Sequence, residues 1–581
     1  MNRSRPLFGF AAFAVACALP CVALVGCEDG SSADTEDPGE QGGNGGEAGA
    51  GLGGASGKGG TAGASGKAGS SQGGSAGKDA GVDSGDAAKD ASSDESIAPE
   101  AQTEAGSPDP LTLLNHPCND PIATFYDPIP SLPAWDSSKR GEIVRCAVER
   151  WVPASEIQAA MVQLGYKGAP LTSGARVVRF AYRTERLSNL NGVVVDGISA
   201  ALALLPDHPR ASSAAQPLVV AAHGSIGIAD KCAPSRDDIV ALGTHLDDAH
   251  SLMLPLVGKG WTVVAPDYAG FGFGATTAWS LAEDEAHSVL DSTRAMGKLL
   301  KQGSLSGKVV VVGHSQGGHA TLATHAFHKS YGLDGTLVGV AAMAPLWMNN
   351  GAWGAALSPL VGLNTTDDKG TLAYSVDYFY GHGELYDGPG HGLDPFEDGV
   401  KDLVKEIFTT ECLRDAEDRM VELGNKPGSF YSFGFQSGVS TCVISGVCMG
   451  DNADKWMPRF KADRPSIDPH GPPIVVWAGG LDSSITPGRI QCMLERFDAN
   501  LAAATDPTTT IRVCADPTAV HSGFVGDRPD LSDGITRRSM DWVDQWIAAR
   551  TLGEAEPPVC LDETGLSTEP LECETPPPND E

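Results

Sequence analysis

The sequence is poor in basic residues for its length of 581. It has 41 Lys and Arg against 74 Asp and Glu, which gives a formal net charge of −33 at pH 7. Residues 28–110 hold 16 acidic and 4 basic residues, and residues 551–581 hold nine acidic and no basic ones. The body between them, residues 111–550, keeps a net charge of −14. A body of this sign disfavours nucleic acid and anionic lipid headgroups as ligands, whereas it allows neutral substrates.

Large apolar side chains are almost absent from residues 28–110, which are rich in Gly, Ala, Ser and Asp. A segment of this composition cannot bury enough apolar surface to offset the entropy that is lost on ordering. We therefore expect residues 27–110 to form a flexible tether. A Gly-rich coil of this length reaches on the order of 50 Å, which would hold a domain away from a membrane surface.

Residues 1–26 have the pattern of a secretory signal peptide, because Arg3 and Arg5 precede an apolar run that ends in "LVGC". This ending, with Gly26 before Cys27, resembles the lipobox of bacterial lipoproteins, in which the cysteine is lipidated. An uncleaved membrane helix is the alternative, since the run is nearly long enough to span a bilayer. The polar stretch directly after Cys27 favours the lipoprotein. We expect an exported protein whose lipid anchor holds it to a bacterial membrane, inner or outer, or to the cell surface.

The sequence lacks any pair of cysteines with the C-x₂-C spacing of a typical zinc site. Ten of the 13 cysteines follow residue 27, and an even number in an exported chain predicts disulfides, five at most. Two candidate pairs are close in sequence, Cys442 with Cys448 and Cys560 with Cys573, although spacing does not determine connectivity. We expect neither a metal nor a cofactor, and the oligomeric state stays open.

Short apolar runs alternate with helical periodicity from residue 176 onward. The runs at 176–185 and 192–205 predict an antiparallel pair of strands. Further buried strands are expected at 217–224, 261–268, 308–315, 337–345, 473–482 and 510–516. Helices are expected between most of them, for example at 283–301, 317–331 and 533–550. This alternation predicts an α/β fold with a mostly parallel, doubly wound sheet that is covered by helices on both faces.

One long interval, residues 346–472, has no clear buried strand. A loop of that length without secondary structure is uncommon in an ordered domain. We therefore expect a mostly helical insertion that forms a cap over the carboxyl edge of the sheet. The predicted organisation is a capped domain at residues 111–550, followed by an acidic, Pro-rich tail at 551–581.

The segment "VVVVGHSQGGHA" contains the pattern G-x-S-x-G, from Gly313 to Gly317. A nucleophilic serine in this pattern sits on a sharp turn between a strand and a helix, and both flanking elements are predicted here. The two glycines allow neighbouring backbone segments to pass closely. The alternative is a buried strand that leaves through a glycine turn and carries an idle serine. The context favours Ser315 as the nucleophile.

A serine hydroxyl is a weak nucleophile until a base accepts its proton. In this arrangement the acid and the base follow the serine in that order. Asp482 ends the late apolar run "VVWAGGLD", and its competitor Asp516 lies only five residues before the candidate base. His521 is the only histidine between the last predicted strand and the last predicted helix. We expect Ser315, Asp482 and His521 to form a catalytic triad. The alternatives are that Asp482 is only a helix cap or turn residue and that His521 is only an exposed loop imidazole.

Two backbone N–H groups should stabilise the oxyanion of the tetrahedral intermediate. Gln316, directly after the nucleophile, is expected to supply one of them. We assign the other to Ser225, with Ile226 as its neighbour, in the loop after the strand that ends "AAHGS". Simple turn chemistry is an alternative explanation for the "HG" pair in this loop.

Together these residues resemble the α/β-hydrolase fold. More narrowly, "HGSIGIADKCAPS" (223–235), "APDYAGFG" (265–272) and "GHSQGGHA" (313–320) resemble the secretory lipase family, which includes the fungal lipase A type. The resemblance covers residues 111–550 and implies a Ser/Asp/His esterase with a cap. It also implies a disulfide between Cys232, the cysteine of "CAPS", and the cap, where Cys412 is the candidate. The signal, the tether and the tail lie outside the family pattern.

We therefore expect a serine carboxylic ester hydrolase, a lipase or an esterase, that acts on an acyl ester or lipid through an acyl-enzyme on Ser315. A serine exopeptidase of the same fold is one alternative, although no acidic anchor for a substrate amine is evident. A surface protein that keeps the fold as an idle scaffold is the other, because fold alone does not establish function. Acyl-chain length and alcohol preference stay open.

Overall fold

The computed structural model describes residues 109–557, apart from 130, 189–191, 244–245, 358–368, 425, 450–452, 518 and 522–538. The expected signal peptide, the lipidation residue Cys27, nearly all of the tether, and Cys560 and Cys573 in the tail lie outside the described residues. Within the described part of the chain, no helix has the length and apolar character needed to cross a membrane. The same residues contain no cluster of side chains suited to holding a metal ion.

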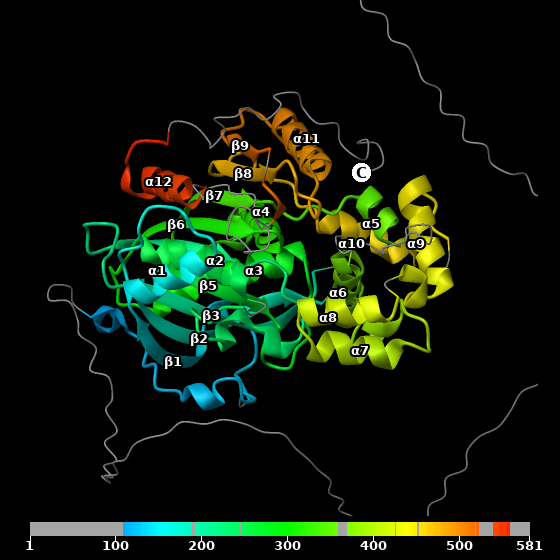
Figure 1. The fold of residues 1–581 in the computed structure, drawn as a ribbon, viewed down its shortest axis with the longest axis horizontal. Helices are drawn as coiled ribbons and strands as arrows, with labels where there is room; N and C mark the ends of the chain where they lie inside the picture. The colour runs from blue at the N-terminus through cyan, green and yellow to red at the C-terminus, as the bar shows by residue number, and fades with distance from the viewer. Residues whose placement is uncertain are drawn as a thin grey trace, which may run out of the picture. The chain divides into compact units, whose positions relative to one another are not determined.

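Nine strands form one sheet in the order β1-β2-β3-β5-β4-β6-β7-β8-β9 (Figure 1). They are β1 (Ile143–Val152), β2 (Ala175–Leu187), β3 (Val194–Pro206), β4 (Gln216–Ala222), β5 (Thr262–Ala269), β6 (Leu305–His314), β7 (Thr336–Met343), β8 (Ile474–Gly479) and β9 (Ile511–Asp516). The pairs from β5 through β4 to β9 are parallel, and the pairs β1–β2, β2–β3 and β3–β5 are antiparallel. The predicted mostly parallel sheet and the predicted antiparallel pair are both confirmed.

The strand β1 and the helix after it were not predicted. The segment IVRCAVERWV mixes apolar and charged residues, and its ladder with β2 shifts register twice. At this edge of the sheet the burial of β1 alternates only in part, so its sequence has no regular period of two. A disulfide between Cys118 and Cys146 attaches the preceding segment to this strand.

Helices cover both faces of the sheet (Figure 1). The helices are α1 (Ala154–Gln163), α2 (Asp247–Gly258), α3 (Ala282–Leu299), α4 (Gln316–Tyr331), α5 (Asn350–Leu357), α6 (Lys369–Tyr386), α7 (Lys401–Thr410), α8 (Leu413–Glu422), α9 (Phe433–Ser445), α10 (Trp456–Ala462), α11 (Pro487–Ala503) and α12 (Ser539–Leu552). Residues of α1, α2 and α12 pack on one face, and residues of α3, α4 and α11 pack on the other.

The four valines before the G-x-S-x-G segment show how the two faces are filled. Val309 and Val311 join the core beneath α3 and α4, whereas Val310 and Val312 join the core beneath α1, α2 and α12. Successive side chains of a strand point to opposite faces, so a strand that is buried on both sides must be apolar at every position. This packing holds β6 rigidly in the centre of the sheet.

The helices α5 to α10 lie between β7 and β8 in the sequence and gather on one side of the sheet (Figure 1). They are the helical insertion predicted for residues 346–472, and we call them the cap. Aromatic rings fill the cap core; Tyr378 and Phe379 of α6 contact Trp353, Trp456 and Phe460. The rings bury a large apolar area, which stabilises the cap as a packed unit.

The cap is joined covalently to the body of the fold. A disulfide links Cys232, after β4, to Cys412, before α8, which is the pairing that the family resemblance implies. Next to it, the backbone N–H of Leu413 donates to the carbonyl of Ile226 at 2.9 Å. A second disulfide within the cap joins Cys442 to Cys448, as their spacing suggested.

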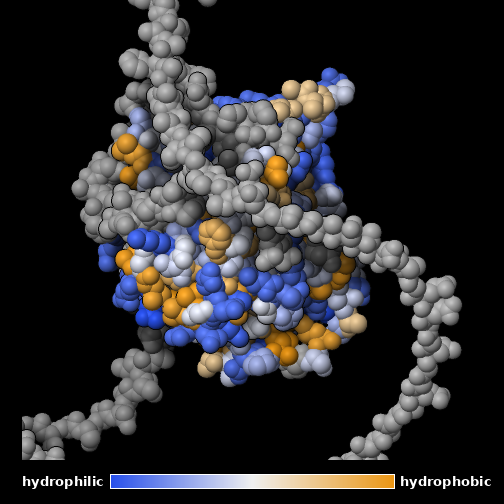
Figure 2. Space-filling view, turned by 90° about the vertical axis from the view of Figure 1, so that its right-hand side faces the viewer, coloured by the Kyte–Doolittle hydropathy of each residue, from blue (hydrophilic) through white to orange (hydrophobic). Residues whose placement is uncertain are grey.

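Apolar and polar side chains share the outer surface of the cap in small patches (Figure 2). Large apolar side chains that are exposed there include Val421, Leu423, Phe433, Val447 and Met449. Scattered exposed residues of this kind are ordinary for a globular surface.

Candidate active site

Ser315 occupies a sharp turn at the centre of the sheet. The strand β6 ends at His314 and the helix α4 begins at Gln316, so Ser315 alone makes the connection. Its backbone has φ 56° and ψ −118°, in the region that non-glycine residues rarely adopt. Its N–H donates to the Met343 carbonyl at 2.9 Å, and its carbonyl accepts from Leu346 N–H at 2.9 Å. These bonds hold the strained turn in place and present the serine at the carboxyl edge of the sheet.

The two glycines of the turn are required by close backbone contacts. A Cβ atom at Gly317 would lie 1.9 Å from the carbonyl oxygen of Ala222 in β4. A Cβ atom at Gly313 would lie 2.1 Å from the carbonyl oxygen of Gly317. Both distances are far shorter than a van der Waals contact, so no other residue fits without a shift of the backbone.

His521 lies between Ser315 and Asp482. Its Nε2 atom is 2.9 Å from Ser315 Oγ, and its Nδ1 atom is 2.8 Å from Asp482 Oδ2. An ionised carboxylate can only accept, so Nδ1 carries the proton that it donates to Asp482. Nε2 is then free to accept the proton of the serine hydroxyl. The three residues predicted from the sequence therefore meet in one hydrogen-bonded chain.

Asp482 is oriented by the turn that follows β8. Its other oxygen, Oδ1, accepts hydrogen bonds from the backbone N–H groups of Ser484 at 2.9 Å and Ile485 at 2.7 Å. The side chain of Asp482 is 1% exposed and that of His521 is 23% exposed. The carboxylate is thus buried and fixed, while the imidazole keeps access to solvent. The competitor Asp516 ends β9, where its carbonyl accepts from Gly480 N–H at 2.7 Å.

His314 supports the base, a relationship that the sequence did not predict. Its Nε2 atom lies 2.7 Å from the backbone carbonyl of His521, and the two rings are 4.8 Å apart. A carbonyl only accepts, so the His314 ring donates this bond and holds the loop that carries His521. The only signal for it is the position of His314 beside the nucleophile.

The two residues expected to bind the oxyanion are Gln316, at the start of α4, and Ser225, after β4. Gln316 is the first residue of α4, so its backbone N–H has no acceptor within the helix. Ser225 follows β4, and its hydroxyl accepts a hydrogen bond from Trp279 Nε1 at 2.8 Å. The carbonyl of its neighbour Ile226 accepts a hydrogen bond from the backbone N–H of Leu413 in the cap. Ser225 therefore stands where the loop after β4 meets the cap.

Hydrogen bonds join the motif "CAPS" to the motif "APDY". Ser235 donates to the carboxylate of Asp267 through its backbone N–H, at 2.9 Å, and through its hydroxyl. Burial raises the pKa of Asp267 to about 7, against the lowering effect of these hydrogen bonds. Tyr268 donates from its hydroxyl to the His223 carbonyl at 3.0 Å. The two motifs thus brace the loop that carries Ser225.

Parts of the chain are similar to known lipases and esterases. The secretory lipase family matches residues 237–349, which include the Ser315 turn. None of the curated proteins compared with this chain matches it. Among solved structures, the rice cell wall degrading esterase LipA from Xanthomonas oryzae is similar, with a TM-score of 0.52 and 18% identity over 71% of this chain and 99% of that chain. Lipase A from Candida antarctica in its closed state gives a TM-score of 0.45 and 16% identity over 72% of this chain and 84% of that chain.

The likeness to the Xanthomonas esterase shows the α/β-hydrolase fold. The family match adds the reaction class, with an ester or lipid as substrate, and it indicates export. The chain therefore has the α/β-hydrolase fold, and residues 237–349 match the secretory lipase family, which supports a serine carboxylic ester hydrolase.

Proposed function

We propose that Ser315 is the nucleophile, His521 the general base and acid, and Asp482 the residue that orients the imidazole. Ser315 Oγ attacks the ester carbonyl while His521 Nε2 accepts its proton. The tetrahedral intermediate collapses, and His521 donates the same proton to the leaving alcohol. An acyl-Ser315 ester remains, and water hydrolyses it by the same steps. The observation that supports this proposal is the unbroken chain of hydrogen bonds from Ser315 through His521 to Asp482.

The charge that develops on the ester oxygen is stabilised by backbone N–H groups of Gln316 and Ser225. Gln316 offers a donor at the positive end of α4, where the helix dipole also favours an anion. Ser225 offers its donor from the loop after β4, which is held by the cap. These donors act at low cost because they are already oriented before the substrate binds.

The test is a comparison of full-length wild type with Ser315→Ala. A fluorophosphonate probe should label the wild type and not the variant, and hydrolysis of p-nitrophenyl esters should fall by at least about 10³-fold in the variant. Ser330→Ala, on the exposed side of the same helix α4, is the matched control and should keep both signals. Full esterase activity in Ser315→Ala would contradict the proposal. Aminoacyl-nitroanilides in the same assay test the exopeptidase alternative.

We also propose that the chain is anchored through a lipid on Cys27. The support is the "LVGC" ending and the polar stretch from residue 28 to residue 110. Two or three acyl chains anchor a protein stably, whereas one does not. Radiolabelled palmitate should enter the wild type in a bacterial host and should not enter Cys27→Ser. Equal labelling of both proteins would exclude Cys27 as the site.

A further inference from the structure

The helix α3 places one buried carboxylate against the first turn of α4, directly after Ser315. Glu285 is 1% exposed, and none of the steps proposed above uses it. Its Oε1 atom accepts from the side-chain amide of Gln316 at 2.7 Å and from the backbone N–H of Ser280 at 3.1 Å. Its Oε2 atom lies 2.7 Å from Nδ1 of His319. Glu285 therefore binds both the first residue of α4 and a residue one helical turn later.

The pair of Glu285 and His319 is charged and enclosed. His319 is 2% exposed, and its Nε2 atom lies 2.7 Å from the backbone carbonyl of Asp463. Because a carbonyl only accepts, Nε2 donates to Asp463, and Nδ1 also donates when the Glu285 carboxyl is ionised, which makes the ring an imidazolium. Burial opposes this charge, but the Glu285 carboxylate and the Asp463 carbonyl outweigh it and raise the pKa of His319. Charge-assisted hydrogen bonds of this kind are short and hold their partners firmly.

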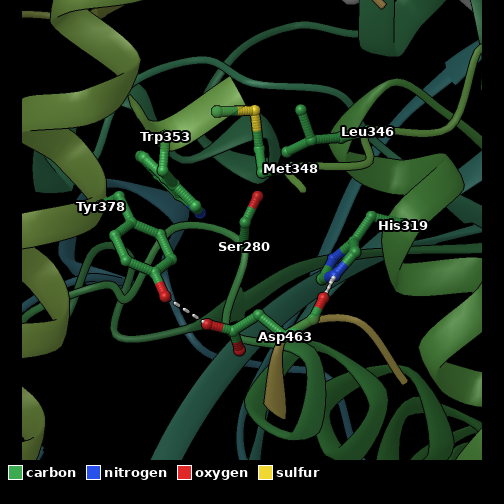
Figure 3. A pocket seen from close by; sticks show the side chains of 7 residues that line it. All are labelled: Ser280, His319, Leu346, Met348, Trp353, Tyr378 and Asp463. Atoms are coloured by element: carbon green, nitrogen blue, oxygen red, sulfur yellow. Dashed lines mark hydrogen bonds between the residues drawn. The ribbon is translucent and has the colours of Figure 1, made fainter. Parts of the chain in front are cut away.

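The same group of residues reaches the cap. Tyr378 of α6 donates to the carboxylate of Asp463 at 2.6 Å, and that carboxylate also accepts from Ala282 N–H at the start of α3. Figure 3 shows the result, in which His319, Asp463 and Tyr378 line one small pocket together with Ser280. The hydrogen bonds thus run from the cap through Asp463 and His319 to Glu285 and Gln316.

We propose that Glu285 is a positioning residue for the oxyanion donor. By holding the Gln316 side chain from below, it fixes the peptide whose N–H faces the developing oxyanion, and His319 keeps Glu285 in place. A displacement of about 1 Å in a catalytic group can cost roughly 10²-fold in rate. The inference rests on the proposed function, because it assigns Gln316 as the donor. Glu285 itself touches no reacting atom.

The experiment measures kcat and KM for p-nitrophenyl butyrate in full-length Glu285→Ala and Glu285→Gln. In Glu285→Ala we expect kcat to fall about 10- to 100-fold with KM changed less than about threefold, because the oxyanion forms only in the transition state. The inhibition constant of an alkyl boronic acid, which mimics the tetrahedral intermediate, should rise by a similar factor.

Glu285→Gln should recover most of the lost kcat. The glutamine oxygen can accept from Gln316 and Ser280, and its amide can donate to Nδ1 of a neutral His319, whose Nε2–H still reaches Asp463. A merely structural role would lower thermal stability in both variants and would leave kcat per folded molecule unchanged. Recovery of kcat by the shape-matched amide therefore reports on positioning.

Asp284→Ala is the matched control. Asp284 is the preceding residue on α3 and is 2% exposed, but its carboxylate pairs with Arg186 of β2 and not with Gln316 or His319 of α4. Its loss should lower thermal stability and leave kcat within about threefold of wild type. Three outcomes would overturn the proposal: an undiminished kcat in Glu285→Ala, no recovery in Glu285→Gln, or an equal loss of kcat in Asp284→Ala.

Gln316→Ala tests the same contact if Glu285→Ala does not fold. It removes the side-chain amide that Glu285 holds and keeps the backbone N–H, so kcat should fall by the factor stated for Glu285→Ala. An unchanged kcat there would overturn the proposal. Failure of the proposed function is a separate result, since it would appear as esterase activity that survives in Ser315→Ala.

Discussion

Nε2 of His521 lies 2.9 Å from Oγ of Ser315, although 206 positions separate the two residues in the sequence. The sheet explains how they meet. Ser315 follows β6, Asp482 follows β8 and His521 follows β9, and these strands lie in the order β6-β7-β8-β9 and run parallel. Parallel strands end at the same edge, so three distant segments deliver their side chains to one place.

Replacement of Asp482 by Asn should reverse the tautomer of His521. The amide oxygen will stay with the two backbone N–H groups that Oδ1 now accepts, so the NH₂ group will face Nδ1 of the ring. Nδ1 must then accept, the proton moves to Nε2, and Ser315 loses its base. We expect kcat for ester hydrolysis to fall about 10³- to 10⁴-fold with little change in thermal stability. Asp516→Asn should stay within about threefold of wild type, and the reverse order of effects would reassign the acid.

Replacement of Gly317 by Ala should displace the turn that carries Ser315. The added Cβ atom would lie 1.9 Å from the Ala222 carbonyl oxygen, in a central strand that cannot easily move. We expect the free energy of unfolding to fall by about 1–3 kcal/mol, measured by denaturant titration, with a large loss of esterase activity. Gly399→Ala is the control, because a Cβ atom there meets no atom within 4 Å. A fully active Gly317→Ala enzyme would show that the turn has more room than these distances allow.

Loss of the disulfide between the cap and the body should destabilise the protein. The bond between Cys232 and Cys412 spans 180 residues of sequence, and the entropy that a cross-link removes from the unfolded chain grows with the closed loop. The double variant Cys232→Ser/Cys412→Ser should lose about 2–5 kcal/mol in the free energy of unfolding. The double variant Cys442→Ser/Cys448→Ser opens a loop of only 6 residues and should lose less. Equal losses in both would argue against an entropic origin.

Asp267 should make the protein less stable as the pH rises from about 4 to about 7. Burial raises the pKa of this carboxyl from its ordinary value of 3.8 to about 7. In this range the folded protein keeps a proton on Asp267 that the unfolded chain has lost. The contribution of Asp267 to the free energy of unfolding is therefore complete below pH 4 and is lost progressively up to pH 7. The loss is on the order of 4 kcal/mol at most.

Asp267→Asn should remove this pH dependence. The amide oxygen can accept from the Ser235 N–H, as the Asp267 carboxyl does, and the NH₂ group can donate to the Ser235 hydroxyl, which would then change from donor to acceptor. Melting temperatures between pH 4 and pH 8 should therefore decline more steeply in the wild type than in the variant. The exposed Asp402→Asn should follow the wild type. Parallel curves for wild type and Asp267→Asn would show that Asp267 is ionised throughout this range.

The strongest predictions from the sequence rested on local patterns. The run of four valines before Gly313 indicated a strand buried on both faces, and the alternation of β6 between two cores confirms it. The turn at Ser315 and the helical insertion were recognisable for the same reason, since turn chemistry and periodicity act over a few residues. The strand β1 was not predicted because charged residues interrupt its apolar pattern at the edge of the sheet.

The sequence by itself determined the nucleophile turn, the order of the acid and base candidates, and a mostly parallel sheet with a helical cap. Only the tertiary structure decided which side chains meet. It paired His521 with Asp482 rather than Asp516, placed His314 against the His521 loop, and set Glu285 of α3 beneath Gln316. The physical reason is that such contacts depend on strand order and on how helices cross the sheet, which no local periodicity encodes.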